Sequence, residues 1–236
     1  MINVALLGKE YQDFNFSLSS VCIGETNKAD NLTKEFGGVY NLLKPQIENI
    51  NFLFFTQGTK DAFIINEKQK SRRTSITRDG KESIYKQKDI STINKSCDWA
   101  HVCYIDDIED YSSFFSFKVP FSIDFCTTNK RESYIQVIDQ AAVVFDSRER
   151  FSLYEDISTS TPIIFHDEKG IEIIKSKKII HKSDITPISG LDVNGAGDIY
   201  AANYIKYYTK YDIIDSANKA MLATTAFLKN QETKNE

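Results

Sequence analysis

The chain has 236 residues, which is enough for one domain with a buried core. It is 41% hydrophobic and 26% charged, an ordinary composition for a globular protein that argues against extensive disorder. Its formal net charge of −4 offers no basic field for a nucleic acid backbone, so we expect no nucleic acid partner.

Short apolar runs that end at a polar residue or a glycine recur along the chain and predict the buried strands of a parallel sheet. The first run covers residues 2–8, and five more cover residues 51–56, 99–105, 121–125, 141–145 and 162–165. Between them, the segments 33–48, 129–140 and 148–156 are long enough for helices. This alternation predicts an α/β fold.

Two segments interrupt the alternation, residues 13–26 and residues 62–85. In the second, residues 72–77 and 81–85 flank Arg78-Asp79-Gly80, which is a hairpin-turn signal. We expect the two segments to form a small β layer, a lid, on a single domain that covers residues 1–236. No repeat and no low-complexity linker marks a domain boundary.

Near the carboxyl end, residues 196–208 and 213–228 predict two helices. The second helix carries a set of mostly apolar residues at helical spacing, and this face is expected to pack on the sheet: Ile213, Ala217, Ala220, Met221, Thr224 and Leu228.

No apolar run reaches the roughly 20 residues that cross a bilayer, and the first residues have no signal-peptide layout. We therefore expect a cytoplasmic protein without a membrane partner. The four cysteines are far apart and form no CxxC pair, which predicts free thiols. The three histidines have no metal-ligand spacing, so we expect no metal held by protein side chains alone.

Residues 191–198 (LDVNGAGD) precede an alanine-rich predicted helix, so Gly195 and Gly197 lie where a loop becomes a helix. Free backbone amides collect there, and the helix dipole favours an anion such as phosphate. Asp198 could accept a proton from a substrate hydroxyl while the amides stabilise a phosphoryl group. The same residues also fit a structural turn followed by a first-turn carboxylate. The residues alone leave these two interpretations about even.

Other phosphate motifs fit less well. Gly190 and Gly195 have P-loop spacing, but Ala196 stands where that motif requires lysine. The dinucleotide pattern GxGxxG fails at Tyr200. The sequence therefore supports neither a Walker site nor a Rossmann site.

Residues 192–202 (DVNGAGDIYAA) resemble the carboxyl-terminal signature of PfkB-type carbohydrate kinases, whose core is D-T-x-G-A-G-D-x-F. The resemblance implies a ribokinase-like three-layer α/β/α sandwich with a central, mostly parallel sheet and a small β lid. It implies that Asp198 is the catalytic base and that the amides of Gly195, Ala196 and Gly197 form an anion hole. It also implies a nucleotide contact at Asn194.

A second resemblance lies near the amino terminus. Residues 23–26 (IGET) and 36–41 (FGGVYN) are similar to the family pattern in which a GG turn and an asparagine bind the hydroxyls of a sugar or nucleoside. Gly8 precedes an aspartate as in the family's G-x-x-x-x-D. Alone, a GG followed by Asn is a common turn and helix start. The resemblance implies substrate contacts at Asp13, Gly37, Gly38 and Asn41.

A third resemblance is at residues 146–149 (DSRE), which directly follow a predicted strand and stand where the family has N-x-x-E. There the glutamate organises a magnesium ion and its waters near the phosphates. The resemblance implies this role for Glu149, with Asp146 contributing indirectly through water. It implies ATP and Mg²⁺ as cofactors.

The family's nucleotide-binding strand ends in T-x-G-x-x-G, but this chain has FHDEKG at residues 165–170. Only Gly170 retains the pattern, and we assign it a nucleotide contact. Asp167 places a carboxylate where the phosphates would approach, so like charges would repel unless they are compensated. The chain is also short between Asn41 and Arg72, where the family has further helical structure.

The leading hypothesis is an ATP- and Mg²⁺-dependent kinase that phosphorylates a hydroxyl of a sugar or nucleoside. The alternative is a catalytically weak binding or regulatory protein on the same fold, which the altered strand at residues 165–170 permits. The resemblance also allows a homodimer formed through the lid, a common arrangement in the family.

Overall fold

The computed structural model describes residues 1–67, 72–77, 83–127, 129–187 and 193–232. Within them, ten strands form one sheet in the order β12-β11-β10-β9-β8-β6-β1-β3-β4, with β2 paired to β1. These strands are β1 (Ile2–Leu18), β2 (Asn31–Gly38), β3 (Ile50–Glu67), β4 (Arg72–Thr77), β6 (Trp99–Val102), β8 (Phe121–Asp124), β9 (Val143–Ser147), β10 (Ile163–Asp167), β11 (Gly170–Lys175) and β12 (Lys178–Asp184). The short strands β5 (Ser83–Ile84) and β7 (Ile108–Asp110) pair separately.

The centre of the sheet is parallel. Strands β3, β1, β6, β8, β9 and β10 follow one another with parallel pairing, whereas β2, β4, β11 and β12 are antiparallel additions. The carboxyl ends of the parallel strands therefore meet at one edge of the sheet, which is where open α/β sheets bind ligands.

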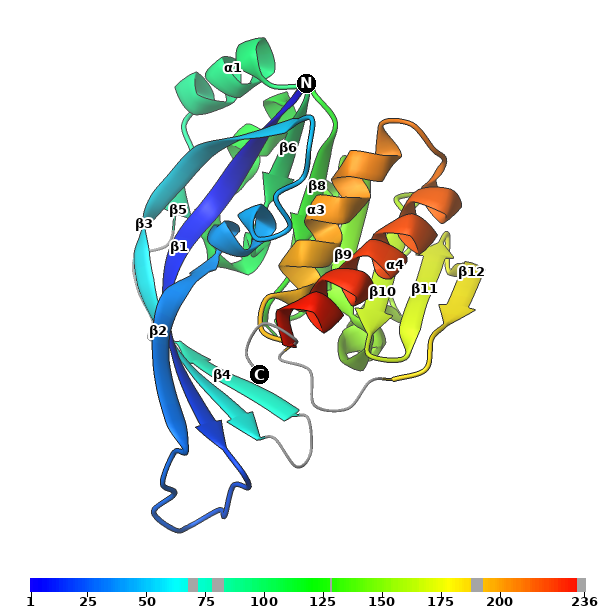
Figure 1. Ribbon diagram of the computed structural model, residues 1–236. Coiled ribbons are helices and arrows are strands. Elements are labelled where there is room, and N and C mark those ends of the chain that lie inside the picture. The colour runs from blue at the N-terminus through cyan, green and yellow to red at the C-terminus, as the bar shows by residue number, and fades with distance from the viewer. Residues whose placement is uncertain (68–71, 78–82, 128, 188–192, 233–236) are drawn as a thin grey trace.

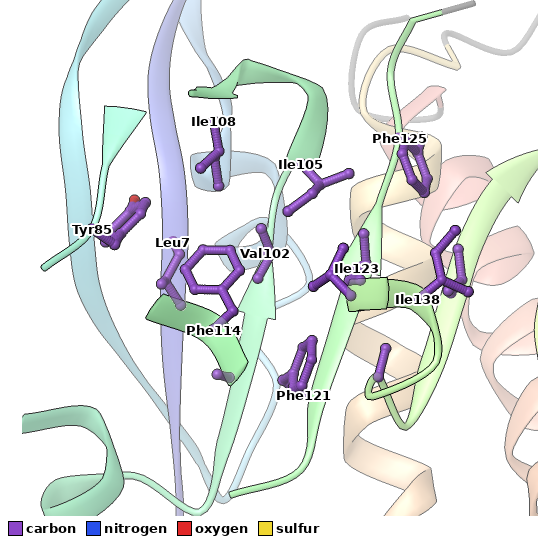
Figure 2. Packing of buried hydrophobic residues seen from close by; sticks show 14 of the residues in the cluster. Leu7, Tyr85, Val102, Ile105, Ile108, Phe114, Phe121, Ile123, Phe125 and Ile138 are labelled. Carbon is purple, nitrogen blue, oxygen red and sulfur yellow. The ribbon is translucent and has the colours of Figure 1, made fainter. Parts of the chain in front are cut away.

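Alternate residues of β1 belong to the two larger clusters of the core. Val4 and Leu6 pack with the helices α3 (Ala196–Tyr208) and α4 (Ile213–Glu232), which lie side by side over one face of the sheet (Figure 1). Ala5 and Leu7 belong to the cluster on the other face. Figure 2 shows part of that cluster, in which Leu7, Val102, Phe114 and Phe121 lie close together.

The second face is covered by short elements. They are α1 (Gln87–Ser96), α2 (Ile135–Ile138) and the 3₁₀ turns η3 (Ile105–Asp107), η4 (Ser112–Ser116), η5 (Arg131–Tyr134) and η6 (Arg148–Tyr154). Helices and turns thus flank a mostly parallel sheet on both faces, and the predicted three-layer α/β/α fold is confirmed. Among the described residues, no helix combines the length and the apolarity needed to span a membrane.

Strands β1 and β3 continue well beyond the helical layers (Figure 1). Their register shifts between Gly8 and Glu10, and their distal halves then pair with β2 on one side and β4 on the other. We call this four-stranded extension the lid; it consists of residues 10–18, 31–38, 59–67 and 72–77. The expected lid segments 13–26 and 62–85 overlap it in part, and the expected turn Arg78-Asp79-Gly80 lies outside the described residues.

The predicted helix at residues 33–48 is wrong. Residues 31–38 form β2, which pairs antiparallel with β1, and Val39–Leu43 form the 3₁₀ turn η1. Gly38 has φ 60°, a left-handed conformation that breaks any helix at this position. Pairing of the main chain with the long strand β1 therefore overrides the local preference for helix.

The predicted helices at residues 129–140 and 148–156 are mostly 3₁₀ turns, η5 and η6, with only the four residues of α2 in α-helical conformation. Helix α1 and the strands β11 and β12 were not predicted. The two carboxyl-terminal helices are confirmed, and α4 buries Ala217, Ala220 and Met221 against the sheet, as its periodicity indicated.

Candidate active site

The amino terminus of α3 lies at the edge where the parallel strands end. Gly195 precedes the helix with φ 76°, and a Cβ at this position would come within 2.5 Å of the Asn41 Cγ atom. Only glycine combines this left-handed backbone with the close approach of Asn41. The Ala196 amide donates to the Val193 carbonyl at 3.0 Å, so the Ala196 amide predicted for the anion hole is already engaged. The first-turn amides of Gly197 and Asp198 have no helical carbonyl before them to bond.

Asp198 is 3% exposed and accepts hydrogen bonds from two side chains. Asn41 Nδ2 donates to Oδ2 at 2.8 Å, and the Tyr104 hydroxyl donates at 3.0 Å to Oδ1 and 3.1 Å to Oδ2. Burial raises the pKa of Asp198 to about 6, while the hydrogen bonds from Asn41 and Tyr104 oppose this shift. A carboxyl group with this pKa is ionised at neutral pH and can accept a proton.

Asn41 is buried in η1 and uses only half of its side-chain amide. Its Nδ2 atom donates to Asp198, whereas its Oδ1 atom is buried without a hydrogen-bond partner among the described residues. A buried amide oxygen without a partner costs about 1–3 kcal/mol. A donor from a bound ligand, such as a hydroxyl group, would satisfy it.

Asp13 comes from the lid end of β1 and lies against Gly37 of β2, where a Cβ would overlap its carboxylate. Asp13 is 3% exposed, and burial raises its pKa, an effect that the hydrogen bond from Asn194 opposes. Asn194 Nδ2 lies 3.3 Å from both Asp13 Oδ2 and Asn15 Oδ1. Asn194, predicted to contact the nucleotide, therefore lies beside a predicted substrate residue.

Gly38 and Gly197 are glycines for packing reasons. A Cβ at Gly38 would lie 2.6 Å from the Tyr11 ring, and the backbone there is left-handed. A Cβ at Gly197 would approach the His166 ring to 3.1 Å, so this glycine lets β10 and α3 pack closely. The structure thus brings together eight of the predicted residues around the start of α3: Asp13, Gly37, Asn41, Asn194, Gly195, Ala196, Gly197 and Asp198.

The predicted magnesium residues lie in a different environment. Asp146 is fully buried and accepts hydrogen bonds from Arg131, Arg150 and the Tyr154 hydroxyl. Both of its oxygens are occupied by these donors, so the residue does not fit a water-bridged metal site. Glu149 is exposed in the first turn of η6. Among the described residues, no group of three or more His, Cys, Asp or Glu side chains could hold a metal ion.

Gly170, predicted to contact nucleotide, begins β11 with φ 138°. A Cβ at this position would overlap the Ser183 carbonyl oxygen of β12, so the close approach of that strand already explains the glycine. The neighbouring Asp167 pairs with Arg148 at 3.5 Å, which offsets its negative charge. Arg148 has two further nitrogens, Nε and Nη2, that are buried without a partner in the described part of the chain.

Sequence reasoning missed two polar residues of this edge, Tyr104 and Asp124. Tyr104 follows β6, and Asp124 ends β8. Burial raises the pKa of Asp124 well above its usual range, and the carboxylates of Asp198 and Asp146 add to this shift. Their position at the ends of apolar runs was the available signal, because the ends of parallel strands converge.

Comparisons with known proteins bear on the fold. No family model matches the sequence, and no curated protein matches it. A nucleoside kinase from Burkholderia thailandensis in complex with inosine matches with a TM-score of 0.71 and 12% identity, covering 94% of this chain and 89% of that chain. A ribokinase from Arabidopsis thaliana complexed with ribose and ATP matches with a TM-score of 0.66 and 13% identity, covering 96% and 91%. A ribokinase from Thermotoga maritima matches with a TM-score of 0.64 and 14% identity, covering 97% of this chain and 92% of that chain.

These identities are low, and the likeness concerns the fold. It extends over nearly the whole chain and agrees with the three layers and the mostly parallel sheet. The chain therefore has a ribokinase-like fold.

Proposed function

We propose that the chain is an ATP-dependent kinase that transfers the γ-phosphoryl group to a hydroxyl of a sugar or nucleoside. One observation carries this proposal: Asp198, buried at the start of α3, is bonded to Asn41, whose Oδ1 atom has no partner among the described residues. A carboxyl group with a raised pKa is suited to act as a general base. An unsatisfied acceptor beside it is suited to bind a hydroxyl.

In the proposed reaction, the acceptor hydroxyl gives its proton to Asp198 while its oxygen forms a bond to the γ-phosphorus of ATP. The bond from that phosphorus to the β–γ bridging oxygen breaks, and ADP leaves with the electron pair. The first-turn amides of Gly197 and Asp198, together with the helix dipole, would stabilise the charge on the transferring group.

The class of molecule that receives the phosphoryl group is inferred from the hydrogen-bond acceptors buried around Asp198. The Asp13 carboxylate and Asn41 Oδ1 both lie near the start of α3, and both can accept hydrogen bonds from a ligand. Neighbouring hydroxyl groups of a sugar ring would donate to both. The similar structures include one with inosine and one with ribose, which fits a sugar or nucleoside acceptor.

The phosphates of ATP would lie near the ends of β9 and β10. Arg148 offsets the charge of Asp167, and its buried Nε and Nη2 atoms are donors suited to phosphate oxygens. Mg²⁺ is usually bound through phosphate oxygens, water and one or two carboxylates. Of the two carboxylates predicted near Mg²⁺, only that of Glu149 is available to it, because Asp146 accepts hydrogen bonds from two arginines.

A second candidate function is a sugar- or nucleoside-binding protein with little or no kinase activity. The engagement of Asp146 by Arg131 and Arg150 favours it, because this removes a group expected near the nucleotide. The engaged Ala196 amide also leaves a smaller anion hole.

The experiment that separates the two functions is a thermal-shift titration followed by an activity screen. For the kinase, ATP with Mg²⁺ raises Tm, and a panel of sugars and nucleosides identifies acceptors that release ADP. Asp198→Asn should keep the ATP-dependent shift and lose at least about 100-fold in ADP release. Stabilisation by a sugar or nucleoside, with none by ATP at any Mg²⁺ concentration, would reject the kinase and support the binding protein.

We also propose that the lid forms a homodimer interface. One lid face exposes apolar side chains, with Leu32 56%, Phe63 41% and Ile76 53% exposed. Phe14 stacks on Phe63 on the same face at a centroid distance of 5.3 Å. Exposed apolar side chains gathered on one sheet face are suited to pack against a second copy of the chain. Analytical ultracentrifugation should give a dimer for the parent chain and a monomer for Ile76→Lys; a parent monomer at all concentrations would reject the interface.

A further inference from the structure

Tyr104 makes a contact with the proposed base that sequence reasoning did not foresee. Its hydroxyl lies 3.0 Å from Asp198 Oδ1 and 3.1 Å from Oδ2, so one donor is shared by both carboxylate oxygens. Asn41 bonds only Oδ2. Among the described residues, the side-chain donor to Oδ1 is the Tyr104 hydroxyl. The orientation of the Asp198 carboxylate plane therefore depends on this hydrogen bond.

The backbone of Tyr104 has φ 61° and ψ 72°, in the left-handed region that a bulky residue rarely adopts. Such a conformation costs of order 1–3 kcal/mol and persists when the surroundings enforce it. Here the Tyr104 carbonyl accepts a hydrogen bond from the Asp107 amide at 2.9 Å, which closes the turn into η3. The strained turn directs the ring toward Asp198.

Two strands of the sheet hold this turn in place. The Tyr11 ring of β1 packs edge-on against the Tyr104 ring at 5.6 Å, and its hydroxyl donates to Asp107. Lys60 of β3 pairs with Asp107 at 2.8 Å, and both side chains are nearly buried. The turn that carries Tyr104 is therefore attached to the two strands that continue into the lid.

We propose that Tyr104 is a positioning residue, which fixes the carboxylate of Asp198 in the orientation that accepts the proton from the acceptor hydroxyl. This proposal rests on the proposed kinase function. A carboxylate oxygen has two lone pairs, so Oδ1 can accept from Tyr104 and still face the acceptor. Burial, followed by the Asp198 carboxylate, raises the pKa of Tyr104 well above its usual value, so its hydroxyl remains a donor and does not compete as a base.

Other charged or titratable groups also face Asp198. Their electrostatic effects on the Asp198 pKa are the same in the parent chain and in the variants described below. They are Cys103 after β6, Asp124 of β8, Arg73 of β4 and Lys44 after η1.

The test compares Tyr104→Phe with Tyr204→Phe. The first change removes the hydroxyl that bonds Asp198 and keeps the ring against Tyr11. The second removes a buried hydroxyl that has no partner in the described part of the chain and lies on α3 itself. The Asp198 pKa is read by carboxyl ¹³C NMR of aspartate-labelled protein, with Asp198→Asn identifying the resonance, and Tm confirms folding.

A hydrogen bond to a charged group corresponds to about 1–2 pKa units, so Tyr104→Phe should raise the Asp198 pKa by that amount. The apparent pKa of the acid limb in the pH profile of kcat should rise by the same amount. At pH values above this limb, kcat should fall about tenfold, while KM for ATP stays unchanged. Tyr204→Phe should change none of these values. An unchanged Asp198 pKa and pH profile in Tyr104→Phe would overturn the proposal.

The NMR measurement separates the two proposals. If the parent chain phosphorylates no acceptor but Tyr104→Phe raises the Asp198 pKa, the kinase function fails while the contact from Tyr104 is supported. If the parent is active and Tyr104→Phe matches it in kcat and in the Asp198 pKa, the positioning role fails while the kinase function is retained.

Discussion

The Asn41 amide donates a hydrogen bond of 2.8 Å to Asp198 although the two residues are 157 positions apart in the chain. This bond joins the turn that follows the lid strand β2 to the first turn of α3. It connects two of the three sequence motifs that resemble the PfkB family, residues 36–41 and residues 192–202. The proposed acceptor site and the proposed base are therefore parts of one hydrogen-bonded unit.

Replacing Asn41 with alanine should reduce kcat/KM for the acceptor about 10- to 100-fold, because a hydrogen bond to a charged group contributes about 1.5–3 kcal/mol. Steady-state kinetics with the identified acceptor measures this loss. Asn51→Ala is the matched control, since it removes an exposed asparagine whose amide donates to Asn3. Equal losses in both variants would contradict a specific role for Asn41.

The pH profile should report the raised pKa of Asp198, which is about 6. The base acts in its ionised form, so kcat/KM should rise about tenfold per pH unit below pH 6 and level off above it. Measurement from pH 4.5 to 8.5 checks this expectation. A profile that is flat from pH 5 to 8 would argue against Asp198 as the base.

The same pKa predicts how stability depends on pH. Asp198 has a folded-state pKa of about 6 against an ordinary value of 3.8 for an aspartate, so the folded protein binds this proton more tightly than the unfolded chain. Its stabilising contribution is complete below about pH 4 and is lost as the pH rises through about 6.

At pH 7.5 the ionised, 3% exposed carboxylate should thus destabilise the fold by about 2–3 kcal/mol relative to an unperturbed carboxyl. Asp198→Asn should therefore raise Tm at pH 7.5, and the gain should shrink toward pH 4.5. Calorimetry at the two pH values measures both differences. A lower Tm for the variant at pH 7.5 would show that burial of the charge is not the dominant effect.

Gly195→Ala should abolish activity by displacing Asn41, whose Cγ atom would lie 2.5 Å from the new Cβ. Gly58→Ala is a close control, because Gly58 has φ 83° and no atom within 4 Å of its Cβ position. Both changes impose left-handed strain of about 1–2 kcal/mol, and both should lower Tm. Only Gly195→Ala should also lose ADP release; full activity in that variant would show that Asn41 can move without consequence.

Asp146→Asn and Glu149→Gln should have separable effects. Loss of the Asp146 charge leaves the fully buried Arg131 with the more distant Asp106, at 4.0 Å, as its ionic partner, and should cost up to about 3–5 kcal/mol of stability. Glu149 is exposed, so Glu149→Gln should leave Tm of the free protein unchanged and weaken only the Mg²⁺-dependent shift with ATP. A Glu149→Gln variant with a normal Mg²⁺ response would remove the last predicted carboxylate from the metal site.

The pattern of apolar residues in a short window correctly predicted those strands and helices whose tertiary contacts agree with the local conformational preference. The strand runs at residues 121–125 and 162–165 form β8 and β10, and the predicted helix at residues 196–208 matches α3. It failed at residues 33–48, where an antiparallel partner, β1, accounts for a strand. Long-range pairing of this kind has no signature in a short window.

For the candidate site, the sequence by itself determined which backbone could form an anion-binding helix start, because Gly195, Gly197 and Asp198 are neighbours in the chain. Only the tertiary structure decided what surrounds that start. Asn41 and Tyr104 come from different elements, and the engagement of Asp146 depends on Arg131 and Arg150 reaching one buried carboxylate. The reason is physical: the burial and hydrogen-bond partners that set the state of Asp198 exist only after the strand ends and α3 have converged.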